Sequence, residues 1–320
     1  MVYKKSLWLL AAALILVSLF IYWPNSKMGY VLDDHYVIAQ NPVVKHPTFV
    51  RIFGSGLFDH ARRKTDSNLN YYRPFLSATF ALDYQLWGMN PFAQRIVNLV
   101  IHILNTSLVF VFLYLLFRNF DRAGIGAIFF CILPIHEWSV RYLVGRGDLL
   151  LAFFTLSSLV SLIIFIRQEK KEWLWASLGL FVAALLSKEV ALLNVAYIFM
   201  ITFYATRQLR RTVVITAFFG IVAVGYYLLR LQTFPISASS VVDIGGLIQV
   251  AGLGVSYLLR FLMPWAAITA VPYGEMTALL WALSCLGLLI VGLRRSNVRN
   301  DGMAACVLGL FWIMAGHFSF

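Results

Sequence analysis

The chain has 320 residues, of which 61% are hydrophobic and only 12% are charged, and its mean hydropathy is +0.79. Soluble domains are typically about 45–50% apolar and about 25% charged. This composition excludes an ordinary soluble enzyme, a disordered protein and a disulfide-rich secreted module. The sequence therefore predicts an integral membrane protein.

The formal net charge of +12 has two interpretations. In a soluble chain it would suggest a nucleic-acid partner. In a membrane protein, Lys and Arg collect in cytoplasmic loops, because they resist translocation. The second interpretation fits this composition, so we expect no nucleic-acid partner.

Apolar runs of about 20 residues can cross a hydrocarbon core about 30 Å thick. The first run, 7–23, ends in Tyr22-Trp23-Pro24, which is typical of an uncleaved span stopping at the membrane interface rather than of a signal peptide. A long polar segment, 24–93, follows it. Further spans are predicted at 94–117, 123–137, 148–167, 173–187, 190–206, 212–230, 275–293 and 302–318.

The segment 244–264 is apolar enough to cross, but its neighbours point to the same face of the membrane. A re-entrant or interfacial helix resolves this conflict, whereas a true span would reverse everything downstream. We expect an all-α polytopic protein with about nine transmembrane helices, a re-entrant or interfacial helix and one domain over 1–320. The abrupt end at Phe320 also suits a fragment of a longer protein.

Basic residues alternate between two sets of loops. Thirteen Lys and Arg residues fall in one set and four in the other. The richer set comprises the N-terminus and the connections 118–122, 167–172, 207–211 and 294–300. The positive-inside rule then puts the N-terminus in the cytoplasm and the loop 24–93 outside. The membrane would be the bacterial cytoplasmic membrane, or the endoplasmic reticulum in a eukaryote.

Two adjacent carboxylates, Asp33 and Asp34, follow the first span. At a membrane surface, partial desolvation and mutual repulsion can raise the pKa of one carboxyl and make it a proton acceptor. A simpler interpretation is that both residues only solvate the start of a loop.

The segment Phe75–Trp87 has helical periodicity with aromatic residues on one side. This pattern suits an amphipathic helix lying on the membrane surface within the external loop. Arg73, at its start, could bind a phosphate through both arms of its guanidinium or extend to lipid head groups.

Two external turns, 134–148 and 186–189, are dense with polar groups. Their candidate site residues are His136, Arg146, Asp148, Lys188 and Glu189. Together with the aspartate pair and Arg73, these residues fall on one predicted face of the membrane. Cations bind an anionic leaving group and a carboxylate activates a hydroxyl, so the set suits chemistry on a lipid-linked phosphate.

The polar motifs occur in a distinctive order. They are D-D-x-x-x-I-x-x-N-P (Asp33–Pro42), Y-R-P-F with L-D-Y-x-L-W-G-x-N-P (Tyr72–Pro91), P-I-H with V-G-R-x-D-L-L (Pro134–Leu150) and S-K-E (Ser187–Glu189). As an ordered set over about 22–195, they resemble the tetratricopeptide-containing transmembrane O-mannosyltransferases and their bacterial relatives. These belong to the GT-C glycosyltransferase superfamily, which includes the protein O-mannosyltransferases.

This resemblance implies a GT-C-like bundle and an inverting glycosyltransferase. Such an enzyme takes a sugar, mannose in the eukaryotic case, from a polyprenyl-phosphate or dolichyl-phosphate donor. It passes the sugar to a hydroxyl of a protein or glycan acceptor on the external or lumenal face. No cofactor is required by the resemblance, although the aspartate pair leaves room for a divalent cation.

The family's acidic pair falls on Asp33 and Asp34. We expect Asp33 to be the general base and Asp34 its positioning partner, although the sequence does not distinguish the two. Candidates for the donor phosphate are Arg73, Arg146 and Lys188. Residues expected to shape the site are Tyr72, His136, Asp148 and Glu189. The sequence departs from the family at Trp138, where relatives often carry an acidic residue, and it contains no tetratricopeptide repeats.

Two alternatives remain at this stage: a transporter of lipids or solutes, and an inactive or truncated homologue acting as a membrane scaffold. A transporter should place polar residues near the bilayer midplane and show inverted repeats. Here the charged candidate residues gather at one predicted face of the membrane, and the two halves of the sequence show no repeat of each other. The pattern favours the enzyme over the transporter.

Overall fold

The computed structural model describes residues 2–25, 27–61, 71–133 and 136–233, and these ranges are helical without any strand. The chain divides into two compact units, Met1–Ile236 and Ser237–Phe320. The predicted spans 275–293 and 302–318, and the segment 244–264, lie outside the described residues. The expectation of one domain over 1–320 stays a prediction.

Four segments are long and apolar enough to cross a membrane. They are α5 (Pro91–Phe117), α8 (Arg146–Gln168), Glu189–Thr206, which joins the turn η3 (Glu189–Leu193) to α10 (Asn194–Thr206), and α11 (Leu209–Thr233), whose apolar part ends at Arg230. Each coincides with a predicted span. For the described ranges, the prediction of an all-helical protein with membrane-capable helices is confirmed.

Three other predicted spans form shorter helices. They are α1 (Val2–Tyr22), with its apolar part at Ser6–Tyr22, α6 (Phe120–Ile132) and α9 (Lys171–Ser187). Within the described ranges, four helices rather than seven therefore meet the length and composition of a full crossing. The predicted total of nine spans is not confirmed.

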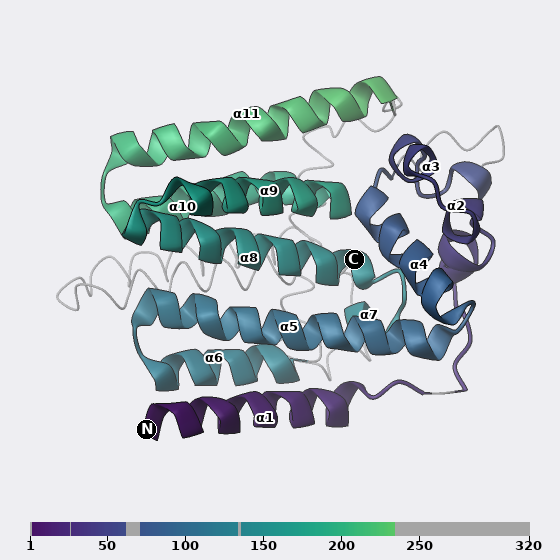
Figure 1. Cartoon of the computed structure of the whole chain (residues 1–320), viewed down its shortest axis with the longest axis horizontal. Coiled ribbons are helices and arrows are strands. Elements are labelled where there is room, and N and C mark those ends of the chain that lie inside the picture. The colour runs from purple at the N-terminus through teal and green to yellow at the C-terminus, as the bar shows by residue number, and fades with distance from the viewer. Residues whose placement is uncertain (1, 26, 62–70, 134–135, 234–320) are drawn as a thin grey trace, which may run out of the picture. The chain divides into compact units, whose positions relative to one another are not determined.

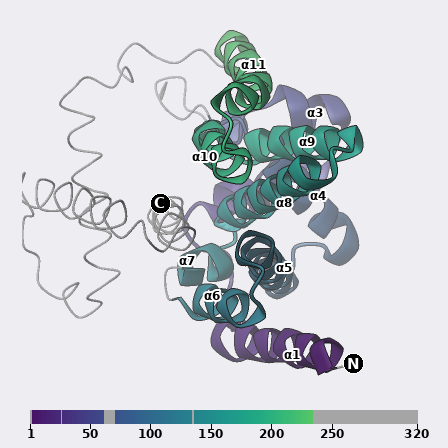
Figure 2. The same cartoon turned by 90° about the vertical axis from the view of Figure 1, so that its left-hand side faces the viewer.

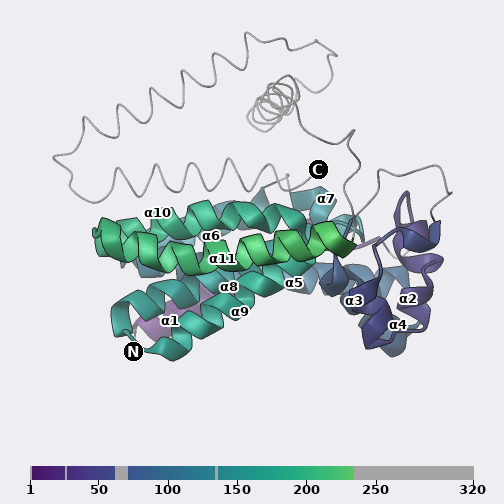
Figure 3. The ribbon, with the colours of Figure 1, turned by 90° about the horizontal axis from the view of Figure 1, so that it is seen from above.

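The long helices lie side by side and alternate in direction along the chain (Figures 1 and 2). The turns that follow α5, α8 and α10 lie at the end that holds the N-terminus. At the other end lie α2 (Pro42–Lys45), α3 (Phe49–Gly54), α4 (Pro74–Trp87) and α7 (His136–Arg141) (Figure 3). The described loops that the charge pattern separates thus occupy opposite ends of the bundle.

The helix boundaries follow local chemistry. The Asn90 side chain accepts a backbone N–H of the first turn of α5, and Pro91 occupies a first-turn position where no N–H is needed. This helix ends at Arg118, which adopts a left-handed conformation with φ of 54°. Glu169 and Arg207 end α8 and α10 in the same way, so three short turns close that end of the bundle.

The segment between α1 and α5 has its own apolar core. It contains the π-helical turn η1 (His35–Ala39), the short turn η2 (Asp59–Ala61) and the helices α2 to α4. Leu76 and Phe80 of α4 pack with residues of η1 and α8 in this core. The predicted helix over 75–87 is confirmed as α4, while its position on a membrane surface stays a prediction.

Candidate active site

Asp33 and Asp34 are neighbours in sequence but have opposite surroundings. Asp33 is exposed, whereas Asp34 is 0% exposed. The Asp34 carboxylate accepts backbone N–H groups from Val31 at 3.1 Å and from Val144 at 3.2 Å. Asp34 therefore ties the loop after α1 to the loop before α8.

Burial raises the pKa of Asp34 to about 6, although the hydrogen bonds from Val31 and Val144 act in the opposite direction. Both of its oxygens accept a backbone N–H, and neither faces solvent. Each oxygen of Asp34 thus already accepts one hydrogen bond from the backbone. Elsewhere in the described part of the chain, no three His, Cys, Asp or Glu side chains gather as a metal site.

The loop that carries Asp33 is held in a strained conformation. Leu32 has a φ of 49°, a left-handed conformation that costs a residue with a Cβ about 1–2 kcal/mol. The backbone N–H of Asp33 donates to the Tyr142 hydroxyl at 3.2 Å. Strained residues of this kind cluster at functional sites, because the surrounding structure must hold them.

Arg95, near the start of α5, anchors the same loop from inside the protein. Its guanidinium donates to the carbonyls of Met28 at 2.5 Å, Gly29 at 2.6 Å and Arg141 at 3.0 Å. Arg95 was not among the site residues predicted from the sequence. The available signal was a charged side chain at the beginning of a predicted span, because such residues are usually functional or paired.

Arg73 precedes α4 and forms a two-pronged ion pair with Glu189. Its Nη2 lies 2.6 Å from Oε1 and its Nε donates to Oε2 at 3.1 Å. The guanidinium also lies 4.6 Å from the centre of the Tyr71 ring. Burial acts to lower the pKa of Arg73, but the hydrogen-bonded Glu189 carboxylate outweighs it and raises that pKa.

Lys188 forms a second ion pair, with Asp148 in the first turn of α8. Because Lys188 and Glu189 are consecutive residues at the junction of α9 and η3, the two ion pairs are adjacent. Arg230, near the end of α11, is close enough to Glu189 to interact electrostatically. We call Arg73, Asp148, Lys188 and Glu189 the charged cluster.

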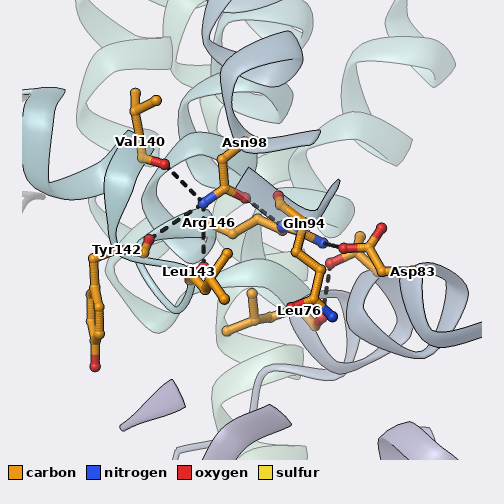
Figure 4. A network of polar contacts seen from close by, with 9 residues as sticks. Leu76, Asp83, Gln94, Asn98, Val140, Tyr142, Leu143 and Arg146 are labelled. Carbon is orange, nitrogen blue, oxygen red and sulfur yellow. Dashed lines mark hydrogen bonds and ion pairs between the residues drawn. The ribbon is translucent and has the colours of Figure 1, made fainter. Parts of the chain in front are cut away.

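Arg146 points into the protein, toward Asp83, Asn98 and Gln94 (Figure 4). It is 0% exposed, and its Nη1 lies 2.6 Å from Oδ2 of Asp83 in α4. Its Nε donates to Oδ1 of Asn98 at 2.7 Å, and its Nη2 donates to the Gln94 carbonyl at 2.8 Å. The guanidinium also lies 4.3 Å from the centre of the Phe80 ring.

Arg146 was expected to bind the donor phosphate, and this inward arrangement gives that expectation no support. The sequence analysis assigned no role to Asp83 or to Asn98. A buried arginine requires acceptors, so a polar partner for Arg146 was to be expected, but its identity depends on the packing of α4 against α5 and α8.

The two remaining candidates pack against other elements. The ring of His136 lies 4.3 Å from that of Phe130 and 5.3 Å from that of His102, within an aromatic group. The Tyr72 hydroxyl donates to the Phe53 carbonyl at 3.0 Å and so joins the segment before α4 to α3. Both residues support neighbouring structure in the described part of the protein.

The predicted residues thus form three groups at the end of the bundle that holds α4 and α7. The loop of Asp33 and Asp34 contacts the segment 142–144, the charged cluster joins α4, α8 and η3, and the Arg146 network joins α4, α5 and α8. Chemically, the set offers an exposed carboxylate, two largely buried cations that are paired with carboxylates, and a rigid support.

Comparison with known proteins finds relatives over part of the chain. The chain is 28% identical over 237 residues to protein O-mannosyl-transferase F38B6.6 of Caenorhabditis elegans, covering 72% of this chain and 33% of that protein. It is 32% identical over 159 residues to protein O-mannosyl-transferase TMTC1 of Mus musculus, covering 47% of this chain and 16% of that protein. With human TMTC3 the identity is 28% over 140 residues, covering 44% and 15%.

The matched part is a third or less of each relative's length. No protein-family model and no solved structure matches the chain. Several relatives carry the same name at 26–32% identity, which agrees with the resemblance given by the ordered motifs. The chain is therefore a homologue of the protein O-mannosyl-transferases and resembles a GT-C glycosyltransferase.

Proposed function

We propose that the protein is a membrane-embedded inverting glycosyltransferase that uses a polyprenyl-phosphate or dolichyl-phosphate sugar, with mannose as the sugar. The acceptor is a hydroxyl group, with protein Ser and Thr side chains as the first candidates. The names of the relatives support the reaction class. The observation that carries the site assignment is the exposed Asp33, held on a strained and anchored loop.

In the proposed reaction, the Asp33 carboxylate takes the proton of the acceptor hydroxyl as its oxygen attacks the anomeric carbon. The bond from that carbon to the phosphate oxygen breaks, and the lipid phosphate leaves with the electron pair. Attack opposite the leaving group inverts the anomeric configuration. A positioned general base of this kind contributes roughly 10²- to 10⁴-fold to the rate.

For the lipid phosphate we propose Arg73 and Lys188. Both side chains are 12% exposed or less, and each is held in place by a carboxylate of the charged cluster. A guanidinium carries five N–H donors, so Arg73 has donors for a phosphate beyond the two that Glu189 accepts. The transfer then has side-chain cations for the leaving group, and we expect transfer to continue in the presence of EDTA.

We further propose that the Asp33 end of the bundle faces the periplasm or the lumen. The N-terminus and the turns after α5, α8 and α10 would then face the cytoplasm. This orientation is supported by the thirteen basic residues of one loop set against four of the other.

The test uses the full chain in membranes, radiolabelled polyprenyl-phosphate mannose and a Ser/Thr-rich acceptor peptide. We expect Asp33→Asn to lower transfer by about 10²-fold or more. Asp121→Asn is the matched control, because Asp121 is an exposed carboxylate in the first turn of α6, at the opposite end of the bundle. Unchanged transfer by Asp33→Asn would overturn the assignment of the base, and no transfer by the wild type would overturn the enzyme.

A further inference from the structure

We propose that Asp83, Arg146 and Asn98 form a positioning unit for Asp33, and that Arg146 acts through this unit rather than on the donor phosphate. The inference rests on the proposed function of Asp33. It is carried by a continuous set of polar contacts. These contacts run from α4 to the segment 140–144 (Figure 4), and the Tyr142 hydroxyl links that segment to the Asp33 loop.

The first contact is the ion pair of Asp83 and Arg146, with side chains 4% and 0% exposed. Removing two charges from water is costly, and a buried ion pair is often no more stabilising than apolar residues of similar volume. Such a pair is therefore weak evidence for stability alone. Its value here is geometric, because it fixes the guanidinium between α4, α5 and α8.

The second contact sets the orientation of Asn98. Since the Nε of Arg146 can only donate, the Asn98 atom that lies 2.7 Å from it must be the carbonyl oxygen. The amide nitrogen then has to face the other way. It lies 3.3 Å from the carbonyl oxygens of Val140 and Tyr142 and 3.5 Å from that of Leu143.

The third set of contacts reaches Asp33. The segment 140–144 carries the Tyr142 hydroxyl, which accepts the backbone N–H of Asp33, and the Val144 N–H, which donates to Asp34. Asn98 therefore holds the segment against which the Asp33 loop is built. Movement of this segment would move the carboxylate that takes the acceptor proton.

Direct binding of the donor phosphate by Arg146 is hard to reconcile with these contacts. Its nitrogens contact Asp83, Asn98 and the Gln94 carbonyl, and the Phe80 ring lies against the guanidinium. A phosphate would have to displace the Asp83 carboxylate from a site with no exposed surface. The charged cluster offers cations that are easier to reach.

The test replaces the ion pair with apolar residues of similar size, in the double variant Asp83→Leu with Arg146→Met. Removing both charges avoids an unpaired buried charge, so the variant should fold. We expect its kcat to fall about 10- to 100-fold, because a small displacement of a reacting group is costly. The KM for polyprenyl-phosphate mannose should stay within about twofold, because a positioning residue does not bind the donor.

Arg146→Lys provides a second variant in case the double variant does not fold. Lysine keeps the positive charge but cannot reach Asp83, Asn98 and the Gln94 carbonyl together, so we expect the same fall in kcat. The matched control is Glu169→Gln with Arg211→Gln, which removes an exposed ion pair near the opposite end of the bundle. This control should leave kcat and KM unchanged.

Hydrogen exchange gives a readout that does not depend on activity. The backbone N–H groups of Asp33 and Val144 should exchange at least about tenfold faster in the double variant. Both hydrogen bonds depend on the position of the segment 140–144, which the variant releases. Unchanged exchange, or a rise in KM with kcat intact, would overturn the positioning role. A wild type without activity, or an Asp33→Asn variant with full activity, would instead overturn the proposed function.

Discussion

At the scale of single residues, Asp33 and Asp34 show that neighbouring carboxylates can have separate tasks. The carboxylate of Asp34 accepts hydrogen bonds from two backbone N–H groups, those of Val31 and Val144, whereas Asp33 stays exposed. An exposed carboxylate can meet a substrate hydroxyl, and a buried one can fix the loop that carries it. The pair therefore works as a base with its support, rather than as two equivalent acids.

The stability that Asp34 contributes to the folded protein depends on pH. Burial raises the pKa of Asp34 from 3.8 to about 6, so between these values the folded protein holds a proton that the unfolded chain has released. The stability that this bound proton contributes is fully present below pH 4. It is lost as the pH rises from about 4 through 6, and the loss is about 3 kcal/mol at most.

We expect the wild type to lose stability relative to Asp34→Asn between pH 4 and pH 6, because the variant has no carboxyl to titrate at this position. Thermal unfolding of both proteins in detergent across this range measures the difference. Parallel curves for the two proteins would contradict the raised pKa of Asp34.

Leu32 gives a second prediction at this scale. Glycine tolerates its φ of 49°, so Leu32→Gly should be about 1 kcal/mol more stable than Leu32→Ala, which keeps the Cβ that causes the strain. The glycine should also loosen the loop and lower sugar transfer. Thermal unfolding and the transfer assay measure the two effects, and a glycine variant no more stable than the alanine variant would show that the turn is unstrained.

How much of the site could be predicted depended on where each residue lies. Asp33 and Arg73 stand out in sequence because they are charges in a loop or at a helix start, beside apolar spans. The same reasoning treated Arg146 as another external cation, because a sequence does not show which way a side chain points. Its partners Asp83 and Asn98 are 63 and 48 positions away, so only the packing of α4, α5 and α8 identifies them.

At the scale of elements, hydropathy predicted helices well and crossings less well. It located α5 and α8 to within three residues, because their apolar runs are long and bounded by caps. The predicted span 123–137 was too long: α6 ends at Ile132, and Pro134 follows in the sequence. The residue before a proline disfavours the helical conformation. A hydropathy profile does not include this steric effect, so it placed the end of the helix too late.

The pairing of α8 and α9 depends on polar contacts as well as on apolar packing. The hydroxyls of Ser158 and Ser177 each donate to the other residue's carbonyl at 2.8 Å and lie 3.0 Å apart. We expect a double-mutant cycle of Ser158→Ala and Ser177→Ala to give a coupling of about 0.6 kcal/mol, the average for such contacts between membrane helices. Equilibrium unfolding in mixed micelles measures it.

The control for this cycle is Ser107→Ala. The Ser107 hydroxyl is exposed and donates to the Ile103 carbonyl within its own helix, α5. Its removal should cost close to nothing and should not couple to Ser158→Ala. A coupling between Ser158 and Ser177 that is no larger than this background would mean that the two helices associate through apolar packing alone.

At the scale of the described unit, the distribution of charge gives the two ends of the bundle different properties. One end carries many basic residues in its short turns, a pattern that the positive-inside rule associates with a cytoplasmic face. The other end contains three largely buried ion pairs, Arg73 with Glu189, Asp83 with Arg146 and Asp148 with Lys188. The first pattern could be predicted by counting residues, but the second required the structure, because pairing depends on elements distant in sequence.

This polarity makes a topological prediction that single cysteines can test. In a background without the native cysteines, Val50→Cys places a thiol on α3, and Lys170→Cys places one in the turn between α8 and α9. Both positions are exposed and lie at opposite ends of the bundle. In intact cells, or in sealed vesicles with the external face outward, a membrane-impermeant maleimide should label Val50→Cys directly and Lys170→Cys only after permeabilisation. Labelling of both thiols from one side would mean that the helices between them do not carry the chain across the membrane as proposed.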